Sequence, residues 1–129
     1  MNNSASLSLL LQDISKPKNN AFFQKTTDYE QKVGVSPDEI SANLSIIAST
    51  DYENSTSSII DVNKSFVVEL NGTSYFFIYQ TKGENGVIQV FRTHPSNKAY
   101  NFQYIGSCSS NNEEYVYIEK MYQNSIEVA

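Results

Sequence analysis

Residues 65–80, SFVVELNGTSYFFIYQ, decide the fold. Asn71-Gly72 lies between two segments of alternating apolar residues. This dipeptide is a strong hairpin signal, because both positions of its two-residue turn need positive φ. A two-residue turn sets Leu70 opposite Thr73 and Phe66 opposite Phe77. The stretch therefore predicts two antiparallel strands with a fixed register.

The predicted hairpin carries large apolar side chains on both faces, since alternate residues of a strand share a face. The first face holds Phe66, Val68, Leu70, Tyr75, Phe77 and Tyr79. The second face holds Val67, Phe76 and Ile78, with Ser65, Glu69 and Ser74 between them. The first face is continuous enough to form the core. The mixed second face is typical of a strand buried on both sides, or of one whose outer face contacts a partner.

Further strands are predicted toward the C-terminus, separated by turn-rich segments at 82–86, 93–97 and 109–112. They cover 87–92, 99–107 and 114–122. Consecutive strands joined by short turns predict an antiparallel β-meander of about five strands.

The N-terminal half has helical signals instead. Leu7, Leu10, Leu11 and Ile14 fall at helical spacing and predict a helix over 5–15, which the Lys16-Pro17 pair ends. A second helix is predicted within 19–33 and a third over 36–49, while 59–62 suits a helical turn or an edge strand. We expect an α+β protein, with N-terminal helices packed on a C-terminal antiparallel meander. The chain reads as a single domain, 1–129, with a helical part at 1–62 and the sheet at 63–124.

The charge of the chain is acidic and unevenly distributed. The net charge is −5, and residues 28–61 carry seven carboxylates against Lys32 alone. Phosphate binding needs clustered Lys and Arg, so the composition argues against nucleic acid as a partner. Acidic stretches are commonly solvated surface, but they also attract basic proteins. Asp51 and Glu53 are candidate contacts for such a partner.

No apolar run reaches the roughly 20 residues of a membrane helix. The N-terminal segment also lacks the pattern of a signal peptide. We therefore expect a protein that does not bind membranes and that is cytoplasmic, or is delivered by a route that leaves no N-terminal signal. The one cysteine, Cys108, excludes an internal disulfide.

The sequence contains few residues that suit catalysis. His94 is the one histidine, and it lies in a predicted turn before the strand that leads to Cys108. No serine or cysteine stands in a recognised nucleophile motif, and one His with one Cys cannot build a typical zinc site. We predict a protein that is not an enzyme and needs no metal or cofactor.

Tyrosine is concentrated in the predicted sheet, which holds seven of the nine tyrosines. Tyrosine suits strands in general, but it is also enriched at binding hot spots because it joins an apolar ring to a polar tip. We hypothesise that the sheet face away from the helices, or an edge strand, contacts a partner. The candidate contacts there are Tyr79, Tyr100, Tyr104, Tyr115 and Tyr117.

These observations favour a non-enzymatic, acidic protein-binding module. An inhibitor or immunity-type protein, or a phage anti-defence protein, has this character, and its partner is expected to be another protein, of basic charge. The alternatives are a small-ligand-binding α+β domain and a small acidic dimeric secretion chaperone. A homodimer that forms through the sheet face or an edge strand is a further alternative.

Overall fold

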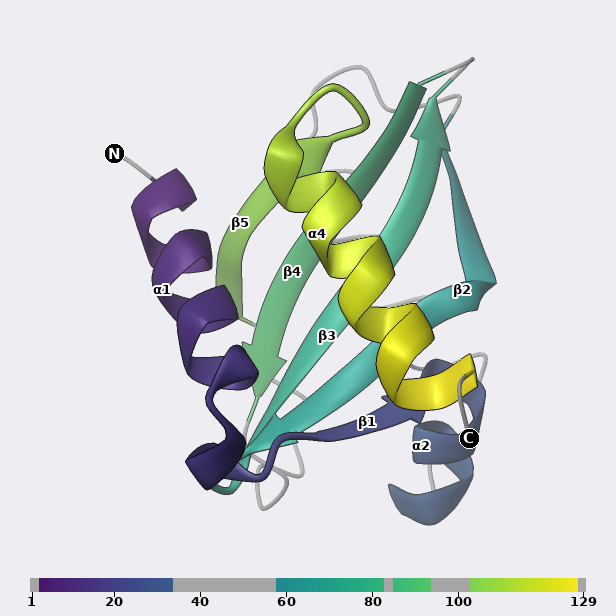
Figure 1. The fold of residues 1–129 in the computed structure, drawn as a ribbon. Coiled ribbons are helices and arrows are strands. Elements are labelled where there is room, and N and C mark those ends of the chain that lie inside the picture. Colours follow the sequence, from purple (N-terminus) through teal and green to yellow (C-terminus); the bar gives the residue numbers. More distant parts are fainter. Residues whose placement is uncertain (1–2, 34–57, 83–84, 94–102, 128–129) are drawn as a thin grey trace.

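The computed structural model describes residues 3–33, 58–82, 85–93 and 103–127. Its helices are α1 (Asn3–Ser15), α2 (Thr26–Val33) and α4 (Glu113–Tyr122), with a short 3-10 turn η1 (Pro17–Asn19) and a π-helical turn η3 (Gln123–Glu127). Its strands are β1 (Phe22–Lys25), β2 (Ser58–Leu70), β3 (Thr73–Lys82), β4 (Asn85–Thr93) and β5 (Gln103–Ser109). The predicted α+β class is confirmed (Figure 1).

The five strands of the described segments form one antiparallel sheet in the order β1-β2-β3-β4-β5. The β2–β3 hairpin has the predicted register, with Phe66 opposite Phe77 and Leu70 opposite Thr73. Its turn places Asn71 at φ 52° and Gly72 at φ 82°, as the two-residue turn requires. The Asn-Gly signal therefore predicted both the hairpin and its register.

The main core lies between one face of the sheet and the helices α1 and α4 (Figure 1). The four apolar residues that predicted α1 are all buried there: Leu7, Leu10, Leu11 and Ile14. On the sheet side, Phe66 and Phe77 stack with ring centroids 4.8 Å apart, and the ring of Tyr122 from α4 lies 4.6 Å from that of Phe66. The first face of the hairpin is thus the core face, as expected.

The second face of the hairpin is also buried, contrary to the hypothesis of a free outer face. Val67, Phe76 and Ile78 are at most 1% exposed. On this side, Tyr29 of α2 packs edge-on against Phe76 with ring centroids 5.3 Å apart, and its hydroxyl is 3.1 Å from the Ser74 hydroxyl. The mixed pattern of this face therefore reflects a strand buried on both sides.

The prediction of a strand at 114–122 is wrong, because this segment forms α4. Ile118 and Tyr122, four residues apart, are the buried residues of this helix. Glu113 and Glu114 occupy the first turn, where the helix dipole favours negative charge, and Lys120 occupies the last turn. The helical spacing of the apolar residues and the favourable charges at the two helix ends outweigh the β-propensity of the segment YVYI.

The strand that completes the five-stranded sheet is β1, which lies in the segment where the sequence predicts a helix, 19–33. Asn20, in the left-handed region at φ 50°, turns the chain after η1, and β1 then pairs with β2. Phe23 stacks on Phe66 with ring centroids 5.9 Å apart. Pairing and burial thus make residues 22–25 a strand, and the helix is confined to α2.

The remaining predicted elements either have different bounds in the structure or lie outside the described residues. The strand predicted at 99–107 is described as β5, and residues 59–62 belong to β2. The predicted helix over 36–49, together with His94, Tyr100, Asp51 and Glu53, lies outside the described residues. No helix in the described segments combines the length and apolar character needed to span a membrane.

Replacing Gly72 with alanine should lower the free energy of unfolding by about 1–2 kcal/mol, because an L-residue at positive φ is strained. A Cβ at this position would meet no atom within 4 Å, so the cost is confined to the backbone. Urea denaturation measures the loss. The control Asn71→Gly should change stability by less than about 0.5 kcal/mol, since glycine tolerates φ 52°. Unchanged stability in Gly72→Ala would contradict the turn geometry.

Candidate functional site

The tyrosines selected from the sequence do not form one surface. Tyr79 is only 5% exposed and belongs to the core beneath α4, where its ring lies 6.0 Å from that of Tyr115. Tyr104 is half-buried on β5, and its hydroxyl donates to the Ser107 hydroxyl at 3.0 Å. Tyr117 is exposed on α4. The structure therefore brings Tyr79 and Tyr115 together, and it leaves Tyr117 as the candidate that solvent reaches most freely among those described.

An irregularity in β2 shapes the first candidate site. The register with β3 shifts between Asp61 and Phe66, so that a bulge interrupts the ladder. The Asp61 carboxylate accepts from the backbone N–H groups of Asn63 and Lys64 at 3.0 and 3.2 Å. The Ser65 hydroxyl donates to the Asp61 carbonyl at 2.8 Å and accepts from the Tyr79 N–H at 3.0 Å. Such bulges often lie beside functional sites, because they redirect side chains.

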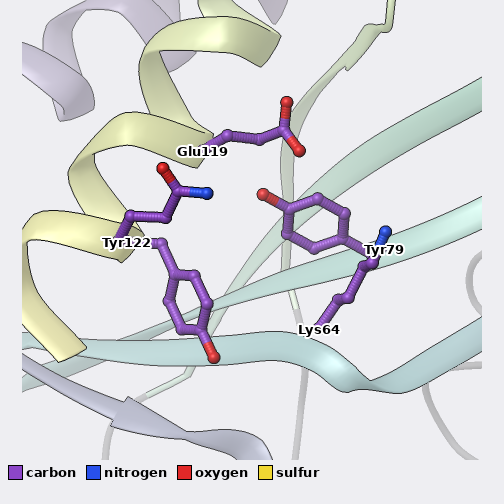
Figure 2. A pocket seen from close by; sticks show the side chains of 5 residues that line it. Lys64, Tyr79, Glu119 and Tyr122 are labelled. Carbon is purple, nitrogen blue, oxygen red and sulfur yellow. The ribbon is translucent and has the colours of Figure 1, made fainter. Parts of the chain in front are cut away.

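A pocket of about 160 Å³ lies between this bulge and the end of α4, and we call it the bulge pocket. Its lining residues are Lys64, Tyr79, Glu119, Tyr122 and Gln123. Figure 2 shows Tyr79 directing its hydroxyl from β3 toward α4, from which Glu119 extends, with the Tyr122 ring beneath. The pocket thus collects a carboxylate, an ammonium group, an amide and two phenol rings.

Two phenol groups near the bulge pocket, those of Tyr79 and Tyr115, resist ionisation. Burial, and then the neighbouring Glu119 carboxylate, raise the pKa of Tyr79 well above its ordinary value of 10.0. The same two causes, in the same order, raise the pKa of Tyr115. Both phenols are therefore neutral hydrogen-bonding groups at neutral pH.

Cys108 lies in the same core and is a weak nucleophile. Burial, and then the Glu114 carboxylate, raise the pKa of its thiol to about 12. The residue is buried in the cluster beneath α1 and α4. Among the described residues, no three His, Cys, Asp or Glu side chains gather as a metal-binding group.

Thiol labelling should reflect this burial. At pH 8, Cys108 of the folded protein should react with iodoacetamide at least about tenfold more slowly than the same cysteine in urea-unfolded chain, because the thiolate is the reactive form. Mass spectrometry over time measures both rates. Equal rates in the folded and unfolded protein would show that the thiol is accessible.

A second candidate site lies on the other side of α4. Two adjoining hollows of about 420 and 350 Å³ share Phe23 and Ser125, and we call them together the β1–α4 groove. The groove is bordered by Ile14 and Ser15 of α1, by Phe22, Phe23, Gln24 and Lys25 of β1, by Asp28 of α2, by Tyr117, Lys120 and Met121 of α4, and by Asn124 and Ser125 of η3. It therefore joins residues of three helices to an edge strand of the sheet.

Two properties distinguish the β1–α4 groove from ordinary surface. Phe22 is 53% exposed and Tyr117 is 43% exposed, so large aromatic rings border it in contact with solvent. The side-chain oxygen of Gln24 is buried and accepts no hydrogen bond from the described part of the protein. A buried acceptor without a donor costs free energy, which a ligand that brings an N–H or O–H group can recover.

Most residues of the two sites are not predicted as site residues from the sequence. Glu119 and Tyr122 were assigned to a strand, although their three-residue spacing would place them on one side of a helix. Phe22 and Gln24 were assigned to a helix. The helical period of 113–122 is the signal that would have placed Glu119 and Tyr122 on one side of a helix.

In comparisons with known proteins, no family model, no curated protein and no solved structure matches this chain.

Proposed function

We propose that this protein is a non-enzymatic protein-binding module whose contact surface is the β1–α4 groove. The exposed rings of Phe22 and Tyr117 carry the proposal, since aromatic residues beside a hollow are typical of interface hot spots. The unsatisfied Gln24 acceptor supports it, because a partner can supply the missing donor. The occupant is a segment of another protein that wraps around the β1 edge, packs apolar side chains against Phe22 in one hollow and Tyr117 in the other, and brings an N–H group to Gln24.

The charge of the chain suggests the kind of partner. The net charge of −5 attracts a basic protein at long range, while the border of the groove carries Lys25, Asp28 and Lys120 in mixed sign. We infer that charge accelerates the encounter and that the apolar groove holds the partner. An inhibitor, immunity-type or anti-defence protein acting on a basic target has this combination. Its association rate would fall as salt is added.

Site-specific photo-crosslinking tests this proposal. A benzophenone amino acid is placed at Phe22, at Tyr117 and, as a control, at Thr81, which is exposed on β3. The first two positions should crosslink one and the same protein, while Thr81 should not. The captured protein, once purified, should form the same two crosslinks again with purified module.

Two outcomes would refute the groove as the contact surface. One is crosslinking of the purified partner from Thr81 but from neither Phe22 nor Tyr117. The other is crosslinking from the groove positions to a second copy of this chain alone, which would favour a homodimer.

A further inference from the structure

The bulge pocket carries opposite charges that do not neutralise each other. Lys64 comes from the bulge in β2 and Glu119 from α4, and both line the same pocket. Among the residues that the structure describes, neither has an oppositely charged side chain within ion-pairing distance. The pocket therefore presents one anionic and one cationic group to whatever enters it.

We propose that the bulge pocket binds a small zwitterion of the α-amino-acid class, with its ammonium group at Glu119 and its carboxylate at Lys64. A ligand with only a positive charge would meet Lys64 unfavourably, and one with only a negative charge would meet Glu119 unfavourably. A zwitterion pairs with both. This inference is independent of the β1–α4 groove, which lies on the other side of α4.

The size and walls of the bulge pocket fit such a ligand. An apolar cavity of about 150 Å³ admits a molecule of benzene size. The 160 Å³ of the bulge pocket accordingly suits a small amino acid such as alanine or serine. The rings of Tyr79 and Tyr122 supply aromatic walls, against which an ammonium group is stabilised by cation–π attraction. The neutral Tyr79 hydroxyl and the Gln123 amide can donate hydrogen bonds to a carboxylate.

The bulge in β2 explains why the pocket exists at this position. Its conformation is fixed by the hydrogen bonds of the Asp61 carboxylate and the Ser65 hydroxyl within the sheet. Lys64 therefore extends from a fixed backbone instead of a mobile loop. Because this backbone is already ordered, binding at Lys64 does not have to order a loop as well.

NMR titration of the full chain with glycine, L-alanine and L-serine tests the proposal. At least one of them should shift the backbone amide signals of Lys64, Tyr79 and Glu119 in a saturable manner. Ethylamine and propionate each carry one of the two charges, and each should bind at least about tenfold more weakly. Glu119→Gln and Lys64→Gln should each weaken binding by at least about tenfold, which corresponds to about 1.4 kcal/mol.

Matched variants keep the test specific. Glu113→Gln on α4 and Lys18→Gln on η1 remove the same charges at exposed positions outside the pocket, and they should bind like the original protein. Circular dichroism confirms that every variant is folded. The proposal is overturned if none of the three amino acids gives a saturable shift, if ethylamine or propionate binds as tightly, or if Glu119→Gln retains full affinity.

Discussion

Replacing Phe66 with alanine is expected to lower the free energy of unfolding by about 3–5 kcal/mol, the usual cost of removing a buried phenylalanine side chain. Phe66 is fully buried on β2. Its ring stacks with Phe77 of β3 at 4.8 Å, with Tyr122 of α4 at 4.6 Å and with Phe23 of β1 at 5.9 Å. One side chain therefore connects three strands and a helix, so its loss leaves a cavity at their junction.

Urea denaturation followed by circular dichroism measures this effect. The control is Val116→Ala, because Val116 is 46% exposed on α4 and should cost less than about 0.5 kcal/mol. A loss below about 1 kcal/mol in Phe66→Ala would mean that the ring is not at the centre of the core.

The second large effect is expected at alkaline pH. Burial raises the pKa of the Cys108 thiol from its ordinary 9.0 to about 12, so the folded protein retains a proton that the unfolded chain releases. The stability linked to this group is complete below pH 9 and is lost as the pH rises from 9 toward 12, at about 1.4 kcal/mol per pH unit. Tyr79, whose pKa is also raised by burial and by Glu119, adds a loss of the same sign above pH 10.

Urea denaturation at pH 8, 9, 10 and 11 checks this prediction. We expect a fall of about 2 kcal/mol between pH 9 and 11 from Cys108 alone. Cys108→Ala should flatten the curve between pH 9 and 10, and Tyr79→Phe should reduce its slope above pH 10. An identical slope in Cys108→Ala and in the original protein would contradict the burial of the thiol.

The parts of the fold that the sequence predicted are those with local causes. Asn71-Gly72 determines the hairpin, because few other dipeptides accept positive φ at both positions. The leucine spacing in 5–15 predicts α1, because four apolar residues recur on one helical face. In both cases the signal lies within the segment that it describes.

The wrong predictions concern segments of two kinds. In one, the structure depends on contacts distant in sequence, and in the other, the residues fit both a strand and a helix periodicity. Residues 22–25 become a strand because β2 offers them a pairing edge and Phe66 offers Phe23 a stacking partner. In 114–122, alternation and helical spacing are both present, and the position of Ile118 and Tyr122 over the sheet favours the helix.

The candidate sites could not be predicted from the sequence, because their residues come from elements that are distant along the chain. The bulge pocket combines residues of β2, β3 and α4, and the β1–α4 groove adds residues from α1. A single sequence carries no signal that unites Lys64 with Glu119. Of the residues that line the two sites, only Tyr79 and Tyr117 are predicted contacts, and the prediction places both on a sheet face. Tyr79 is instead buried, and Tyr117 lies exposed on α4.

The affinity of the purified complex tests the central claim, that a partner binds in the β1–α4 groove, most directly. Isothermal titration calorimetry compares Phe22→Ser and Tyr117→Ser with Val116→Ser, which changes an equally exposed residue of α4 outside the groove. We predict a loss of at least about tenfold for the first two variants and less than about twofold for Val116→Ser. Unchanged affinity in both groove variants, or a greater loss in Val116→Ser, would contradict the claim.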